Sequence, residues 1–146
     1  MRKNVLKIDL DLYSREEAVN TIVERIRYFR DIMGVPVGYW YKIELLRKTR
    51  YSCKIHIIKP VKDERSIIML QLIFGSDWRK ELNTFYNAEV LKMEYSNRLF
   101  TIKNYNDGFL EAKIEDITLE VRGMIKSPKI KSLRRLIWSK IIRWLH

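Results

Sequence analysis

Two carboxylates, Asp9 and Asp11, lie on a stretch of alternating apolar and polar residues, 5–12. The alternation predicts a strand, in which successive side chains face opposite sides of the sheet. Asp9 and Asp11 would then share one face, roughly 7 Å apart along the strand. Two such carboxylates can chelate a divalent cation or flank a pair of cations. They can also be solvated side chains on the wet face of a half-buried sheet, and this stretch alone leaves both interpretations open.

A second alternating stretch, 51–58, places Ser52, Lys54 and His56 on one face of a predicted strand. Its other face is apolar and includes Cys53, which we expect to be a core residue. If helices cover the apolar faces of both strands, the open face gathers carboxylates, an ammonium group and an imidazole. This set suits a metal-bound triphosphate, because carboxylates hold the cation while Lys54 and His56 contact phosphate oxygens. A hydrogen-bonded structural role for His56 fits equally well.

Helix-capping signals follow both strands. Ser14 and Glu17 form a capping box, and apolar residues recur behind it at helical spacing, which predicts a helix over 15–33. Gly34 suits the position just beyond the end of that helix. Two further helices are expected at about 64–74 and 77–86, capped by Asp63 or Ser66 and by Ser76 or Asp77.

The remaining stretches favour strands, because from Glu89 onward the apolar residues recur with a period of two. The order β-α-β-β-α-α followed by a β meander predicts an α+β fold, in a single domain over 1–126. A break at Ser127-Pro128 precedes a basic amphipathic C-terminal helix within 127–146. The further strands expected are 37–44, 91–95, 98–103, 109–115 and 117–122.

Length and composition exclude several classes of protein. A chain of 146 residues with 47% apolar residues is sufficient for one domain with a sizeable core. The single cysteine, Cys53, excludes an internal disulfide framework and a multi-cysteine zinc site, and it favours a reducing, cytoplasmic setting. We expect neither a signal peptide nor a membrane-spanning segment. The bias toward Ile, Lys, Glu and Arg is typical of a thermophile.

The net charge of +11 is concentrated near the C-terminus, where no acidic residue follows Glu120. This asymmetry predicts a polyanionic partner, DNA or RNA first, and an anionic membrane surface or a replication protein as alternatives for the C-terminal helix. Docking of that helix on the meander is the structural alternative. The candidate nucleic-acid contacts are Lys129, Lys131, Arg134, Arg135, Lys140 and Arg143 in this helix, and Arg47, Lys48 and Arg50 in a basic connection.

Three adjacent aromatic residues, Tyr39, Trp40 and Tyr41, lie on the predicted strand 37–44. In a strand they cannot all face the core, so at least one is expected to be exposed. An exposed ring can stack on a base, as in sheets that bind RNA or single-stranded DNA, or it can fill an interface.

The two strand motifs, Ile8–Leu12 and Ser52–Ile57, resemble in order and separation the opening of the archaeo-eukaryotic primase superfamily, which includes primase-polymerases of plasmids and viruses. The stretch Leu72–Arg79 is similar to a Gly-Asp-Asp-x-x-Arg segment of archaeal mobile-element relatives of that family. The resemblance covers about residues 5–80. It implies an RRM-like βαββα core within the α+β fold.

The resemblance also implies roles for individual residues. Asp9 and Asp11 would be catalytic and would bind Mg²⁺ or Mn²⁺, and His56 would be a catalytic residue that contacts the nucleotide phosphates. Ser52, Lys54 and Arg79 would complete the phosphate-binding set.

One part of the family pattern is missing, because no aspartate lies in a clear strand between Gly75 and Tyr105, where a third metal ligand is expected. Glu89 and Glu94 are candidate substitutes. The leading hypothesis is a nucleic-acid-binding protein in replication, or a related process, of an archaeal mobile element or virus, with a primase-polymerase-like nucleotidyltransferase site. A non-enzymatic regulatory protein that keeps the fold and binds DNA or a partner is the alternative, and a metal-dependent nuclease is the third hypothesis.

Overall fold

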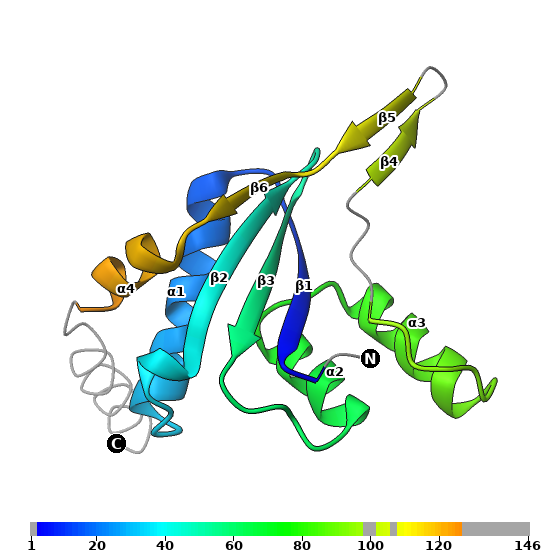
Figure 1. Cartoon of the computed structure of the whole chain (residues 1–146), viewed down its shortest axis with the longest axis horizontal. Coiled ribbons are helices and arrows are strands. Elements are labelled where there is room, and N and C mark those ends of the chain that lie inside the picture. The colour runs from blue at the N-terminus through cyan, green and yellow to red at the C-terminus, as the bar shows by residue number, and fades with distance from the viewer. Residues whose placement is uncertain (1–2, 98–101, 106–107, 127–146) are drawn as a thin grey trace, which may run out of the picture.

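The computed structural model describes residues 3–97, 102–105 and 108–126, with the backbone alone described for 102–105 and 108–111. The fold is α+β, as the sequence predicts (Figure 1). The C-terminal helix expected within 127–146, with its six candidate nucleic-acid contacts, lies outside the described residues.

The βαββα order predicted for the first half of the chain is confirmed. A short 3-10 turn, Val37–Tyr39, precedes the second strand and delays its start relative to the prediction. The elements are β1 (Val5–Leu12), α1 (Arg15–Asp31), β2 (Trp40–Arg47), β3 (Tyr51–Ile57) and α2 (Glu64–Ile73).

The second half begins with α3 (Trp78–Glu89), continues through β4 (Ile102–Tyr105), β5 (Gly108–Glu111) and β6 (Lys113–Asp116), and reaches α4 (Thr118–Ile125). The main sheet has the strand order β1-β3-β2-β6, and every neighbouring pair is antiparallel. Strands β4 and β5 form a separate hairpin. As Figure 1 shows, this hairpin projects beyond the end of the main sheet.

The hydrophobic core lies between one face of the main sheet and the helices α1, α2 and α4 (Figure 1). The alternation read from the sequence places Leu6, Ile8 and Leu10 of β1 on this face, where they are buried. Cys53 is fully buried on the same face of β3, as predicted, and burial raises the pKa of its thiol. The polar residues of both strands therefore lie on the opposite face.

The helices begin at the caps that the sequence indicates. The side chain of Ser14 accepts a hydrogen bond from the Glu17 backbone N–H, and the side chain of Asp63 accepts one from Ser66. The side chain of Asp77 accepts a hydrogen bond from the Arg79 N–H at the start of α3. These caps fix the ends of β1 and of the α2–α3 connection, where several of the candidate site residues lie.

Two of the strands predicted in the second half are wrong. Residues 90–97 form neither strand nor helix, because their backbone turns back along α3, with the Met93 N–H donating to the Asn87 carbonyl. Residues 117–122 were expected to alternate as a strand, but Ile117 is the N-cap of α4 and residues 118–122 lie in that helix, whose Thr118, Val121 and Ile125 are buried at helical spacing. None of the helices that the structure describes combines the length and apolar character required of a membrane span.

Candidate functional site

Strand β1 is irregular at the residues expected to do chemistry. Asp9 pairs with Ser52 and Leu12 with Tyr51, so β1 contains a bulge between Asp9 and Leu12. Asp11 lies in this bulge with a φ of 51°, a left-handed conformation that aspartate tolerates better than most residues. Asp11 therefore departs from the regular alternation that placed it directly in line with Asp9.

The Asp11 carboxylate forms ion pairs with two arginines from distant parts of the chain. Arg50, after β2, donates from Nη1 to one carboxylate oxygen, and Nη2 of Arg79, in the first turn of α3, lies 3.5 Å from the other. Arg79 also contacts Asp77 at 2.9 Å, and this hydrogen bond lowers the pKa of the Asp77 carboxyl. Asp77, through the same bond, raises the pKa of Arg79, and the charges of Asp11 and Asp9 add to the effect.

Asp9 and His56 lie on the same face of the sheet but far apart. His56 is paired with Val5, four residues along β3 from the partner of Asp9. At the usual rise of a strand this corresponds to roughly 13 Å, so one small group cannot touch both side chains. The Asp9 carboxylate makes no hydrogen bond or ion pair with any residue that the structure describes, although its backbone N–H donates to Ser76 Oγ.

His56 is held by its neighbours on the adjacent strand. Its Nε2 hydrogen bonds to Oε1 of Glu44 at 2.7 Å, and its ring lies 6.0 Å from that of Tyr41. Tyr41 is the exposed member of the aromatic run, as expected, whereas Trp40 is buried. Lys54, partly exposed, lies between His56 and the buried Ser52 on β3. The structure thus supports the hydrogen-bonded role for His56 that the sequence left open.

The Asp11 carboxylate is paired with cationic side chains in this structure. Hard divalent cations prefer several oxygen ligands, and cations beside a carboxylate compete with the metal for it. Two guanidinium groups contact Asp11, and no group of three or more His, Cys, Asp or Glu side chains suited to a metal occurs among the described residues. The two candidate substitutes for the third acid lie elsewhere: Glu89 pairs with Arg65 on α2, and Glu94 lines a cavity beside α3.

The end of the sheet next to Asp11 is rich in cations and carries an exposed aromatic ring. Arg50 lies 5.9 Å from the ring centre of Tyr13, whose side chain is 72% exposed. Arg47 is paired with the exposed Lys113 across β2 and β6, and its guanidinium lies 5.9 Å from the ring of Tyr51. We define this basic end by Arg47, Lys48, Arg50, Arg79 and Lys113, together with Tyr13. The sequence indicated three of these cations as nucleic-acid contacts but not Tyr13 or Lys113.

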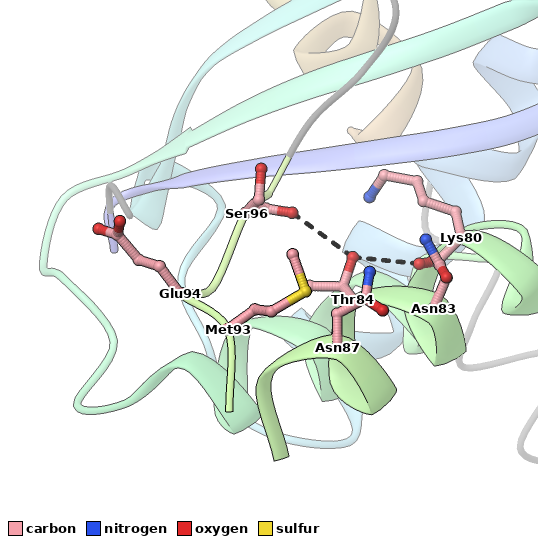
Figure 2. Close-up of a pocket in the computed structure, with 7 residues that line it drawn as sticks. All are labelled: Lys80, Asn83, Thr84, Asn87, Met93, Glu94 and Ser96. Atoms are coloured by element: carbon pink, nitrogen blue, oxygen red, sulfur yellow. Dashed lines mark hydrogen bonds between the residues drawn. The ribbon is translucent and has the colours of Figure 1, made fainter. Parts of the chain in front are cut away.

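A small cavity of about 230 Å³ lies beside α3 (Figure 2). Asn83, Thr84 and Asn87 line it from the helix, and Met93 and Ser96 line it from the segment that returns along α3. Ligand pockets usually measure about 300 to 1,000 Å³, so this cavity is smaller than a nucleotide site.

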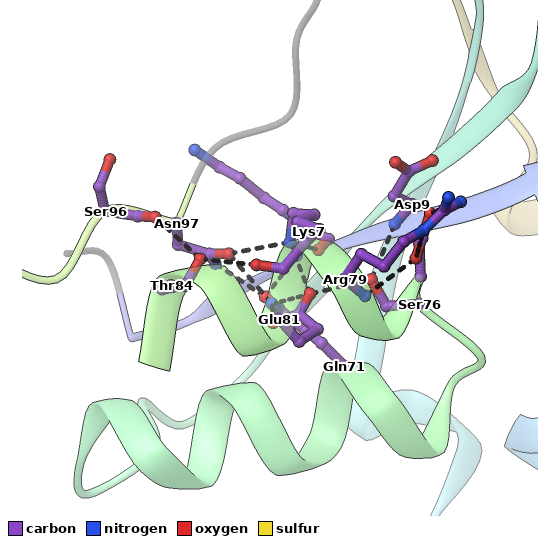
Figure 3. A network of polar contacts seen from close by, with 11 residues as sticks. Lys7, Asp9, Gln71, Ser76, Arg79, Glu81, Thr84, Ser96 and Asn97 are labelled. Atoms are coloured by element: carbon purple, nitrogen blue, oxygen red, sulfur yellow. Dashed lines mark hydrogen bonds and ion pairs between the residues drawn. The ribbon is translucent and has the colours of Figure 1, made fainter. Parts of the chain in front are cut away.

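A buried polar network lies next to this cavity and holds the outer edge of β1 (Figure 3). Gln71 Nε2 donates to the carboxylate of Glu81 at 2.9 Å, and Gln71 Oε1 accepts from the Lys7 backbone N–H at 2.9 Å. Lys80 Nζ donates to Glu81 at 2.6 Å and to the Lys7 carbonyl at 2.9 Å. Ser76 Oγ links Glu81 to the backbone of Asp9, at 2.9 Å and 3.0 Å.

This network positions Asp9 by binding its backbone N–H and the backbone N–H and carbonyl of Lys7, two residues before it. Sequence reasoning missed it, since Gln71 and Glu81 are polar residues at helical positions that the pattern leaves to solvent. One signal was available: Gln71 lies in register with the apolar Ile67 and Phe74 on the buried face of α2.

No protein-family model, no curated protein and no solved structure matches the chain.

Proposed function

We propose that the chain is a non-enzymatic nucleic-acid-binding protein that contacts a single strand through the basic end of its sheet. The observation that carries this proposal is the convergence of Arg50 and Arg79 on Asp11, beside the exposed ring of Tyr13. Cations that track a backbone and an aromatic ring on which a base stacks are the two elements of single-strand recognition.

The shape of the sheet supports the same proposal. In the part of the chain that the structure describes, no helix covers the second face of the antiparallel sheet, an arrangement that supports an RRM-like fold. Lys54 lies on the path from the basic end toward His56 along that face, and Tyr41 lies beside His56 at the far end of this path. A single strand lying along this path would meet the second exposed ring, Tyr41, after Tyr13. The basic residues beyond 126 would add sequence-independent affinity.

A primase-polymerase-like activity in the replication of an archaeal mobile element or virus is the second candidate function. It is favoured by the Asp9 carboxylate, which makes no hydrogen bond or ion pair with any described residue and lies on the face of the sheet opposite the core. The pairing of Asp11 with two arginines makes a binding role without catalysis the better-supported of the two.

The binding proposal is tested by fluorescence anisotropy of the full chain with labelled single-stranded DNA and RNA of equal length. Substituting Arg50 or Arg79 with alanine should weaken binding and lower the slope of affinity against salt by about one for each cation. Arg25→Ala is the matched control, since Arg25 is exposed on α1, away from the basic end.

Two further measurements separate the contribution of base stacking from that of the basic residues beyond 126. Tyr13→Ala should weaken binding by about 1 to 3 kcal/mol without changing the salt slope, because the variant loses the stacking of a base but loses no charge. Deletion of residues 127–146 should lower the salt slope while leaving the effect of Tyr13→Ala in place. Equal affinities for the parent protein and the Arg50, Arg79 and Tyr13 variants would refute the basic end as the binding surface.

A further inference from the structure

Helices α2 and α3 pack side by side as an antiparallel pair. Only the short connection 74–77 joins the end of α2 to the start of α3. At the other end of the pair, Arg65 of α2 and Glu89 of α3 form an ion pair, with Nε 2.9 Å from the Glu89 Oε1. The two helices therefore run alongside each other over the whole length of α2.

An apolar surface covers the outer side of this pair. Each helix carries a row of apolar side chains next to the ion pair. On α2, Met69 and Leu72 follow Arg65. On α3, Trp78, Leu82 and Phe85 precede Glu89. We call these five side chains the α2–α3 patch. They expose between 39% and 62% of their surface, although all are large and apolar. Large apolar areas exposed on a monomeric protein often have a function.

The spacing of the two rows is that of a helix-packing seam. Along α3 the steps from Trp78 to Leu82 to Phe85 are four and three residues, and along α2 the steps from Arg65 to Met69 to Leu72 are the same. Alternating steps of three and four keep a row of side chains on one side of a helix, facing a neighbouring helix. In the described part of the chain no helix covers this side.

We propose that the α2–α3 patch binds the same patch of a second copy of this chain, which makes the protein a symmetric dimer. Two antiparallel helix pairs packed face to face form a four-helix arrangement, in which such rows interdigitate. A two-fold axis near Leu82 places Trp78 of one copy against the partner's Phe85, because Trp78 and Phe85 lie at nearly equal distances on either side of Leu82.

The exposed area agrees with what a dimer requires. The five side chains expose on the order of 500 Å² of apolar surface, given the usual areas of large side chains. A dimer interface of standard size buries about 800 Å² per copy, and roughly two thirds of a homodimer interface is apolar. The patch thus provides the apolar centre of such an interface, with its polar rim drawn from the neighbouring residues.

The charges around the patch favour a second copy over a membrane or an acidic partner. Helices that bind membrane surfaces flank their apolar side with unpaired Lys and Arg. Here the flanking cations are paired, Arg65 with Glu89 at one end and Arg79 with Asp77 at the other. The patch is therefore locally neutral on a chain of net charge +11, so two copies meet there without the repulsion that their other surfaces would cause.

Sedimentation velocity of the full chain, over a range of micromolar concentrations and in moderate salt, tests the proposal. We expect a monomer–dimer equilibrium, and Leu82→Glu or Phe85→Glu should raise the dissociation constant at least about 30-fold, the effect of losing a central interface residue. Leu119→Glu is the matched control, because Leu119 is an apolar residue of α4 that is 82% exposed outside the patch. Circular dichroism verifies that each variant is folded.

A second measurement locates the contact. Leu82→Cys should give a covalent dimer with a short bismaleimide, whereas Leu119→Cys should not, and the native Cys53 is buried and unreactive. A parent protein that remains monomeric at all concentrations overturns the proposal. The proposal is also overturned if the dimer persists in the Leu82→Glu and Phe85→Glu variants but is lost when residues 127–146 are deleted. Binding of a monomeric chain to neutral lipid vesicles through Trp78 would assign the patch to a membrane instead.

Discussion

Arg79, in the first turn of α3, approaches within 3.5 Å of the Asp11 carboxylate in the bulge of β1. This contact joins the start of α3 to the end of β1, although the two are separated by almost seventy residues in the sequence. Arg50 contacts the same carboxylate from the β2–β3 connection. Three separate segments thus meet at one aspartate. The chemistry of this end of the sheet depends on whether the two arginines bind the Asp11 carboxylate or a phosphate group.

Asp11→Asn distinguishes a binding site from a catalytic one. In our proposal Asp11 competes with phosphate for Arg50 and Arg79, so removing its charge should raise the affinity for single-stranded nucleic acid severalfold. Asparagine tolerates the positive φ of this position, so the bulge should remain. Anisotropy titrations at fixed salt measure the change. A metal site that needs the carboxylate predicts the reverse, a loss of Mg²⁺-dependent binding or activity.

Lys80→Met should destabilise the fold by about 3 kcal/mol, because the buried carboxylate of Glu81 loses its only cationic partner among the described residues. The double variant Lys80→Met/Glu81→Gln should recover part of this loss, since it leaves no uncompensated charge. Urea unfolding followed by circular dichroism provides the values. Lys59→Met, at an exposed position, should change the stability by less than about 0.5 kcal/mol. Equal effects at positions 59 and 80 would contradict a role for the network.

The Arg65–Glu89 pair predicts a pH dependence of stability. Hydrogen bonds from Arg65 and then from the Tyr95 hydroxyl lower the pKa of Glu89 from its ordinary 4.5 to about 2. A carboxyl whose pKa is lower in the folded state stabilises the fold fully above its unfolded pKa and loses that contribution as pH falls through its folded pKa. Glu89→Gln should therefore reduce the stability at neutral pH. The difference from the parent should shrink as the pH falls from about 4.5 to about 2.

Measurements of the urea midpoint across this pH range test the Glu89 prediction. Glu94→Gln is the control, because Glu94 is exposed and faces the cavity beside α3 rather than Arg65. A constant difference between Glu89→Gln and the parent at every pH would show that the carboxyl is not titrating in this window.

Gly75→Ala should cost about 1 kcal/mol or somewhat more. Gly75 follows α2 with a φ of +87°, a conformation that disfavours any side chain. An added Cβ would lie 3.7 Å from Cγ2 of Thr21, an ordinary contact, so the cost comes from the backbone. Gly38→Ala is the comparison, since Gly38 has no positive φ and no atom within 4 Å of an added Cβ, and it should be close to neutral. Thermal unfolding of both variants decides the matter.

The local elements of the first half of the chain could be predicted because their signals are local. The alternation over 5–12 and the cap at Ser14 each act over a few residues, and the structure keeps both. The same reasoning failed at 117–122, where alternating Ile117 and Val121 suggested a strand. Packing of Val121 and Ile125 against α1 favours a helix there and leaves Leu119 outside, which no short window reveals.

The candidate site could be predicted only in part, because its contacts join distant segments. The sequence placed Asp9 and Lys54 on one face of the sheet, and the register agrees with that placement. It could not reveal that a bulge moves Asp11 toward Arg50 and Arg79, since a bulge changes which residues pair between strands without changing the alternation of apolar and polar residues in the sequence. Nor could it pair His56 with Glu44, because that requires the β2–β3 register.

Neither edge of the main sheet is a favourable template for a further strand. Along β1, the side chains of Gln71 and Ser76 accept the outward hydrogen bonds of Lys7 and Asp9. Along β6, the edge is only four residues long and carries charged side chains. Open edges are where proteins aggregate by adding strands from other molecules, and here neither edge offers a long, flat template. We therefore expect neither edge of the main sheet to recruit strands from other molecules into amyloid-like assemblies.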